Sequence, residues 1–196
     1  MIGLRFVTLL GAVLMASAMP ATAQTAPAAS CPAWLNHSLP RLQDDAPQAL
    51  CQFAGKVVLV VNTASHCGFT LQYDALEKLS ADYAARGLVV LGFPSNDFGA
   101  QEPGSNAQIA AFCHNTFKVK FPMFAKSSVK GAASNPVFAH LAKVSGQTPS
   151  WNFHKYLVSR DGMVVRSFGS AVAPDSAGFK AELERLLALP VKAVKS

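Results

Sequence analysis

Residues 57–70, which read VVLVVNTASHCGFT, decide the fold. Their first five residues are all apolar and have the length of a buried strand, and the small and polar residues that follow are typical of a turn. Apolar residues then recur at helical spacing, at Leu71, Ala75, Leu76, Leu79 and Tyr83. Cys67 therefore lies where a strand turns into a helix. Unpaired backbone N–H groups and the helix dipole favour a thiolate there, so we expect a reactive thiol.

Strand and helix patterns alternate along the rest of the chain. We expect Thr70 to cap the first helix and Gly87 to end it, and the Ser105–Gln108 pair is a capping box that opens a second helix. Asn135-Pro136 starts a third helix. Further elements are expected at residues 88–93 (strand), 156–159 and 163–168 (a hairpin turning at Asp161-Gly162), and 176–189 (helix).

This order of elements predicts an α/β fold in three layers, a central mixed sheet with helices on both faces. A thiol just after the first central strand, before a helix, is the thioredoxin-like arrangement. The usual Cys-x-x-Cys pair is missing because residue 70 is Thr. A single attacking thiol with a distant partner is thus expected in place of two neighbouring thiols.

The first 23 residues are typical of an export signal. Arg5 precedes an apolar stretch at residues 6–15, and Ala21-Thr22-Ala23 resembles a cleavage site that would leave a mature start near Gln24. The apolar stretch is too short to span a bilayer unaided, so we expect a periplasmic or secreted protein without a stable membrane anchor. The expected divisions are a signal peptide (1–23), an N-terminal extension (24–54), one catalytic domain (55–190) and a tail (191–196).

Two of the four cysteines, Cys31 and Cys51, fall in the N-terminal extension, which is rich in proline and polar residues. An exported chain meets conditions in which disulfides persist. We therefore expect a structural Cys31–Cys51 disulfide that stabilises this segment.

The formal net charge of +6 is spread along the chain. No dense basic run and no interleaved aromatic pattern is present, so nucleic-acid binding is not expected.

Three longer segments carry a family resemblance: VNTASHCGFT at residues 61–70, LGFPSNDFGAQEPG at 91–104 and WNFHKYLV at 151–158. They resemble, in order, the signature segments of the glutathione peroxidase family, over about residues 55–168. The resemblance implies a thioredoxin-like fold and a thiol, Cys67, that attacks hydroperoxides and is surrounded by Gln101, Trp151 and Asn152. It implies no metal and no cofactor.

The chemistry of these residues agrees with that implication. A thiolate that attacks an O–O bond must stay nucleophilic, and a full positive charge beside it would withdraw electron density from sulfur. Neutral donors, the amides of Gln101 and Asn152 and the indole N–H of Trp151, avoid part of that penalty. The expected product on Cys67 is a sulfenic acid.

Two interpretations of Cys113 stay open. It lies on the face of the second helix with Ile109, Phe112 and Thr116, where a cysteine can simply pack in the core. In thiol-dependent members of the resembled family, a cysteine in the matching helix resolves the sulfenic acid by forming a disulfide. That role implies local unwinding of the helix and re-reduction by a thioredoxin-like donor, with glutathione the less expected reductant.

The sequence departs from the family at Ser95 and Asp97, where many members have Cys and Gln. His66 precedes Cys67 and is expected to face solvent. The stretch 126–150 lacks the insertion that tetrameric members use for assembly, which implies a monomer with an open site for bulky organic hydroperoxides as well as hydrogen peroxide.

Two other functions remain as alternatives. An exported thioredoxin-like copper-binding module could use the neighbouring pairs His66-Cys67 and Cys113-His114, because thiolate and imidazole are ligands for copper. A general thiol-disulfide oxidoreductase is the third, and the missing paired cysteine counts against it.

Overall fold

The computed structural model describes residues 1, 3 and 31–190. The predicted signal peptide and the C-terminal tail lie outside the described residues, apart from Met1 and Gly3. Within residues 31–190, no helix combines the length and the apolar character that crossing a membrane requires.

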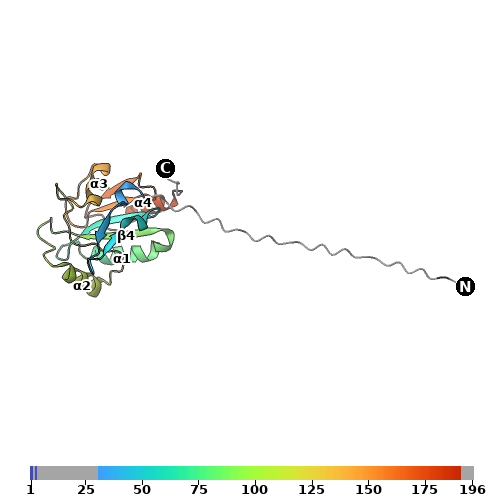
Figure 1. Cartoon of the computed structure of the whole chain (residues 1–196), viewed down its shortest axis with the longest axis horizontal. Helices are drawn as coiled ribbons and strands as arrows, with labels where there is room; N and C mark the ends of the chain where they lie inside the picture. The colour runs from blue at the N-terminus through green and yellow to red at the C-terminus, as the bar shows by residue number, and fades with distance from the viewer. Residues whose placement is uncertain (2, 4–30, 191–196) are drawn as a thin grey trace.

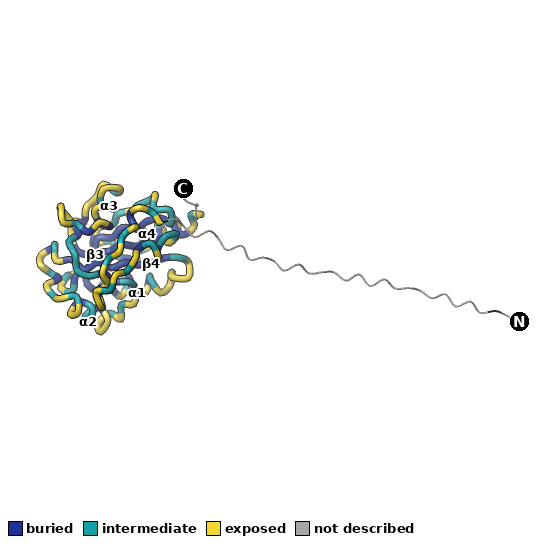
Figure 2. Tube along the Cα trace, in the orientation of Figure 1, coloured by how far each residue is buried: buried dark blue, intermediate teal, exposed yellow. Residues whose placement is uncertain are grey.

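A four-stranded mixed sheet forms the centre of the molecule (Figure 1). Strands β3 (Val57–Thr63) and β4 (Leu88–Pro94) run parallel, and β5 (Lys155–Val158) and β6 (Val165–Phe168) continue the sheet antiparallel in the order β4-β3-β5-β6. Every residue of β3 and β4 is buried, as their continuous apolar runs predict (Figure 2). Their carboxyl ends meet at one edge of the sheet, since Thr63 pairs with Pro94.

Helices cover both faces of this sheet. Alternate β3 side chains pack into two separate hydrophobic clusters, with Val57, Leu59 and Val61 on one face and Val58 and Val60 on the other. Helices α1 (Gln72–Tyr83), α2 (Asn106–Phe117) and α4 (Ala177–Ala188) contribute to the first cluster, and α3 (Pro136–Ser145) contributes to the second. The predicted three-layer α/β fold is confirmed.

Several local predictions are also confirmed. Ser105 and Gln108 form the capping box of α2, Asn135 caps α3 ahead of Pro136, and Gly87 adopts a left-handed φ of 94° after α1. Other predictions are wrong in detail, because α1 begins two residues after Thr70 and has no side-chain cap. Leu71 is 75% exposed and Thr116 is exposed, so neither packs in the core.

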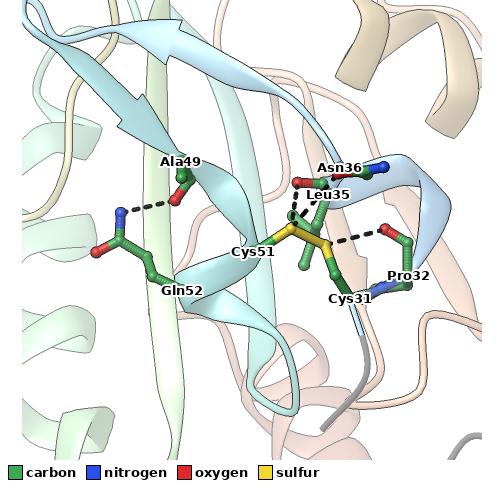
Figure 3. Close-up of a disulfide and its surroundings, with 7 residues drawn as sticks. All are labelled: Cys31, Pro32, Leu35, Asn36, Ala49, Cys51 and Gln52. Atoms are coloured by element: carbon green, nitrogen blue, oxygen red, sulfur yellow. Dashed lines mark hydrogen bonds between the residues drawn. A yellow bond between two sulfur atoms is a disulfide. The ribbon is translucent and has the colours of Figure 1, made fainter.

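The predicted disulfide joins Cys31 to Cys51 across the N-terminal segment, with 5.2 Å between their Cα atoms (Figure 3). It links the start of the described chain, beside a 3-10 helix at Ala33–Leu35, to a second 3-10 helix at Leu50–Phe53. Between them, β1 (Ser38–Pro40) and β2 (Pro47–Ala49) pair as an antiparallel hairpin.

This N-terminal segment packs more tightly than its polar composition suggests. Five of its apolar side chains are buried, namely Trp34, Leu35, Leu42, Leu50 and Phe53. The Leu42 amide donates to the Met123 carbonyl at 2.9 Å, and the Asp45 carboxylate accepts from the Asn106 side chain at 2.9 Å. The hairpin therefore contacts the first residue of α2.

Candidate active site

Cys67 lies in a turn between β3 and α1 that is fixed by hydrogen bonds. The Thr70 hydroxyl accepts from the Cys67 amide at 3.0 Å and donates to the Ala64 carbonyl at 2.9 Å. The Thr70 amide also donates to the Cys67 carbonyl at 3.0 Å. Thr70 is thus used to shape the turn, which explains why it does not cap the helix as predicted.

Cys67 is a half-buried residue, and its thiol is free. The Phe69 amide N–H points at this sulfur at an N···S distance of 3.4 Å. A backbone donor in that place stabilises negative charge on sulfur, as the strand-to-helix position predicts. Neighbouring His66 is exposed, in agreement with its predicted orientation.

The loop after β4 brings Gln101 beside this turn. The His66 amide donates to the Gln101 carbonyl at 3.1 Å, so residue 101 is joined directly to the residue before Cys67. Parallel pairing of β3 with β4 explains this, because both loops leave the sheet at the same edge.

A second loop, just before β5, adds Trp151 and Asn152. The buried Asn152 side chain donates to the Gln101 side-chain oxygen at 3.0 Å and to the Phe98 carbonyl at 3.3 Å. Because the Gln101 oxygen is engaged by Asn152, the amide nitrogen of Gln101 is the group left to donate to a reactant. The Trp151 ring is 39% exposed and lies 6.0 Å from the Phe98 ring, centroid to centroid.

The structure therefore brings Gln101, Trp151 and Asn152 together at the edge of the sheet where Cys67 lies. Among the hydrogen bonds of residues 31–190, the Cys67 sulfur receives that of Phe69 and none from these three side chains. Their direct action on sulfur stays a prediction.

Comparisons with known proteins agree with this arrangement. A family model described as glutathione peroxidase matches residues 37–142. The chain belongs to the glutathione peroxidase family. Its fold is thioredoxin-like.

Individual members of the family are similar over most of their length. The chain is 44% identical over 154 residues to the hydroperoxy fatty acid reductase gpx1 of Synechocystis, covering 74% of this chain and 90% of that protein. It is 46% identical over 140 residues to the glutathione peroxidase-like peroxiredoxin gpx1 of Schizosaccharomyces pombe, covering 69% and 89%. A crystal structure of Trgpx in its apo form superposes with a TM-score of 0.65 at 32% identity, covering 81% and 98%.

The second free thiol of this glutathione peroxidase family member is that of Cys113, which is buried on α2. Burial raises the pKa of the Cys113 thiol to about 11, and the buried Tyr73 phenol lies beside it. The residue before it, Phe112, faces the Cys67 turn, with its ring 6.4 Å from that of His66. Helix α2 thus packs against the turn that carries Cys67, while its own thiol points into the core.

A cavity of about 370 Å³ lies between one face of α2 and the residues just before Cys67, Ser65 and His66. His66 and Glu102 line it on the loop side, and Ile109 and Phe112 line it on the helix side. Its walls combine polar loop groups with apolar helix side chains, so it could accept the organic part of a hydroperoxide.

Sequence reasoning missed three polar side chains near the site. Asn62 is buried at the end of β3, Glu102 is 1% exposed beside Ser65, and Lys155 is fully buried on β5. Burial raises the pKa of the Glu102 carboxyl. All three lie inside the segments that resemble the family signatures. The signal that could have identified them is a polar residue within an otherwise apolar strand, as at Lys155.

Within the part of the chain that the structure describes, no three His, Cys, Asp or Glu side chains come together as a metal site would require. Exposed His114 and buried Cys113 also differ in their access to solvent. The copper-binding alternative has no ligand cluster to support it there.

Proposed function

We propose that this protein is a cysteine-dependent hydroperoxide reductase in which Cys67 is the attacking thiol. The observation that supports this best is that hydrogen bonds connect three loops: the Cys67 turn, the loop after β4 and the loop before β5. The chain also belongs to the glutathione peroxidase family. His66 bonds to the Gln101 backbone, and Asn152 orients the Gln101 side chain. These bonds support the proposal because they bring neutral hydrogen-bond donors to the edge of the sheet that carries the only half-exposed thiol among the described residues.

In the first step the Cys67 thiolate attacks the terminal oxygen of the hydroperoxide. An S–O bond forms, the O–O bond breaks, and the departing alkoxide or hydroxide takes up a proton to leave as alcohol or water. Sulfur is oxidised by two electrons to a sulfenic acid. The amide of Gln101 and the indole of Trp151 stabilise the charge that moves from sulfur to the leaving oxygen.

In the second step Cys113 attacks the sulfenic sulfur, water leaves, and a Cys67–Cys113 disulfide forms. Both the burial of Cys113 and its high pKa oppose this step in the folded helix. Local unwinding of α2 removes both obstacles, because it exposes the thiol to water and lets it approach Cys67.

A thioredoxin-like dithiol then reduces the disulfide and restores both thiols. Two relatives whose names include peroxiredoxin support a protein dithiol as the reductant. The name of the Synechocystis relative, a hydroperoxy fatty acid reductase, and the partly apolar cavity support organic and lipid hydroperoxides as substrates beside hydrogen peroxide.

Export and a monomeric state complete the proposal. The signal-like residues 1–23 and the Cys31–Cys51 disulfide support an oxidising compartment such as the periplasm. The short stretch 126–150 supports a monomer. Amino-terminal sequencing of the exported protein should give a start near Gln24, and an intact Met1 in the periplasmic fraction would contradict it.

The test is peroxide turnover with a thioredoxin system and, separately, with glutathione. Wild type should turn over with thioredoxin, Cys67→Ser should be inactive, and Cys113→Ser should lose thioredoxin-supported turnover. Leu183→Ala is the matched control, because it weakens the same hydrophobic cluster from α4 and leaves the thiol and the cavity lining unchanged. Activity in Cys67→Ser would contradict the function, and full activity in Cys113→Ser would return Cys113 to core packing.

A further inference from the structure

We propose that Lys155 is a positioning residue of this peroxidase, whose buried amine holds the Trp151-Asn152 loop against the start of α1. This inference rests on the proposed function, since it concerns the loop that supplies two of the donors. It assigns a role to a residue that takes no part in the chemistry described above.

Lys155 is a lysine with no exposed surface, located on a strand at the centre of the sheet. Its neighbours across the sheet are Val61 on β3 and Phe168 on β6. Burial in this surrounding lowers the pKa of Lys155 to about 7. An amine is costly in such a place unless hydrogen bonds compensate for its lost hydration.

Two hydrogen bonds use the amine of Lys155. It donates to the Phe153 carbonyl at 2.5 Å and to the side-chain oxygen of Gln72 at 2.7 Å. Gln72 is the first residue of α1, five positions after Cys67, and its side-chain nitrogen donates to the Ser170 carbonyl at 2.7 Å. Lys155 therefore joins the donor loop to the helix that follows the reactive cysteine.

The donor loop needs such a support because its backbone is strained. Phe153 has a φ of 62°, in the left-handed region that a bulky residue rarely adopts. Asn62 restrains the loop from β3, since its side chain donates to the Trp151 carbonyl at 3.1 Å and its carbonyl accepts from the Phe153 amide at 2.7 Å. Lys155 restrains it from β5 through the Phe153 carbonyl.

Both acceptors of Lys155 are uncharged oxygens, and no salt bridge among residues 31–190 involves its amine. An uncharged amine has two N–H bonds, one for each of the two acceptor oxygens. The geometry thus points to directed hydrogen bonding as the role of Lys155. Methionine has a similar length and no donor, so Lys155→Met removes this function with little change in volume.

The experiment measures two quantities on reduced protein: the single-turnover rate constant with hydroperoxide, and the acrylamide quenching of Trp151 fluorescence in a Trp34→Phe background. Lys155→Met is expected to lower the rate constant about 10- to 100-fold, because small displacements of catalytic groups have effects of that size. Quenching of Trp151 should increase. Gln72→Leu, at the half-buried start of α1, should shift both readouts in the same direction by less, because Lys155 keeps its bond to the Phe153 carbonyl.

Leu157→Ala is the matched control, because Leu157 is buried on the same strand and the same face but touches none of these hydrogen bonds. It should lose stability and keep the rate constant within about twofold of wild type, since its cavity is remote from the donor loop. A wild-type rate constant in Lys155→Met and Gln72→Leu would overturn the inference. So would a lowered rate with unchanged Trp151 quenching. If wild type itself leaves hydroperoxide untouched, the proposed function fails, and the quenching result alone decides the positioning role.

Discussion

The two free cysteines show how far the surroundings of a single residue set its chemistry. Cys67 is half-exposed and receives a backbone N–H, whereas Cys113 is buried beside Tyr73 with a pKa raised to about 11. A thiolate is the nucleophile in both proposed steps. The first thiol is therefore accessible to a hydroperoxide in the folded protein, and the second requires a change of conformation.

At the same scale, Gln101 and Asn152 are expected to act as a unit, because Asn152 fixes the orientation of the Gln101 amide. Asn152→Ala and Gln101→Leu should each lower the single-turnover rate constant by about 10- to 100-fold. The double variant should lose little more than either single variant. Losses that multiply in the double variant would show that the two amides act independently.

Buried His154 provides a pH-dependent prediction. Burial lowers the pKa of His154 to about 4, below its ordinary value of 6.5, and its ring accepts or donates a 2.8 Å bond with Ser167. Between these two values the unfolded chain binds a proton that the folded chain does not, so stability is lost as pH falls from about 6.5 to 4.

Chemical denaturation of wild type and His154→Gln across this range measures the effect. The difference in the free energy of unfolding between the two proteins should change by up to about 3 kcal/mol between pH 7 and pH 4. Parallel pH profiles would contradict a buried neutral imidazole.

At the scale of elements, α2 buries fewer side chains than α1, α3 or α4. Ile109 and Cys113 are its two buried core residues, and its last turn ends at Lys118 with a left-handed φ of 55°. A lysine in that conformation costs about 1–2 kcal/mol relative to an unstrained backbone. The helix that carries the proposed resolving cysteine thus combines a small buried face with a strained residue at its carboxyl end.

Lys118→Gly relieves this strain and should stabilise the folded end of α2 by about 1 kcal/mol. If unwinding precedes disulfide formation, the Cys67–Cys113 bond should form about fivefold more slowly. Stopped-flow measurement separates the two steps, and the initial reaction with peroxide is the internal control because it should not change. An unaltered rate of disulfide formation would mean that this end of α2 stays folded.

The sequence predicted most elements because local signals agreed with their tertiary role. Apolar runs predicted β3 and β4, and caps at Ser105, Asn135 and Gly87 set helix ends. The start of α1 was wrong because the Thr70 hydroxyl is used by Cys67 and Ala64, a choice that depends on how the turn folds back. Leu71 fits the helical period but is exposed. Periodicity shows which residues share a helix face, and it does not show whether another element covers that face at the helix end.

For the whole molecule, the N-terminal segment connects the disulfide to the catalytic fold. Its hairpin contacts α2 through Asp45 and Asn106 and the core through Leu42. Replacing Cys31 and Cys51 by serine should lower the free energy of unfolding by about 3 kcal/mol, as expected for a loop closed by residues 20 apart. The rate constant with peroxide should stay close to that of wild type, because no described contact joins the disulfide to the Cys67 turn.

Equilibrium denaturation with and without the disulfide measures this loss, and adding a reductant to wild type is the matched condition. Equal stability of the two proteins would contradict a structural role for the bond.

The site could be predicted only in part. Cys67, Gln101, Trp151 and Asn152 were named from segments that the family shares, and the sheet topology brings those segments to one edge. The roles of the supporting residues Asn62 and Lys155 could not be predicted from the sequence. Each role depends on which backbone carbonyl the side chain binds after folding. Pairings of this kind join residues up to 89 positions apart.

The most direct test of the account is to map the oxidation of all four cysteines after one equivalent of hydroperoxide is added to protein with free Cys67 and Cys113. Mass spectrometry should find a new Cys67–Cys113 disulfide and an intact Cys31–Cys51 bond, and in Cys113→Ser it should find a trapped sulfenic acid on Cys67. Consumption of the peroxide with Cys67 still reduced would contradict the account.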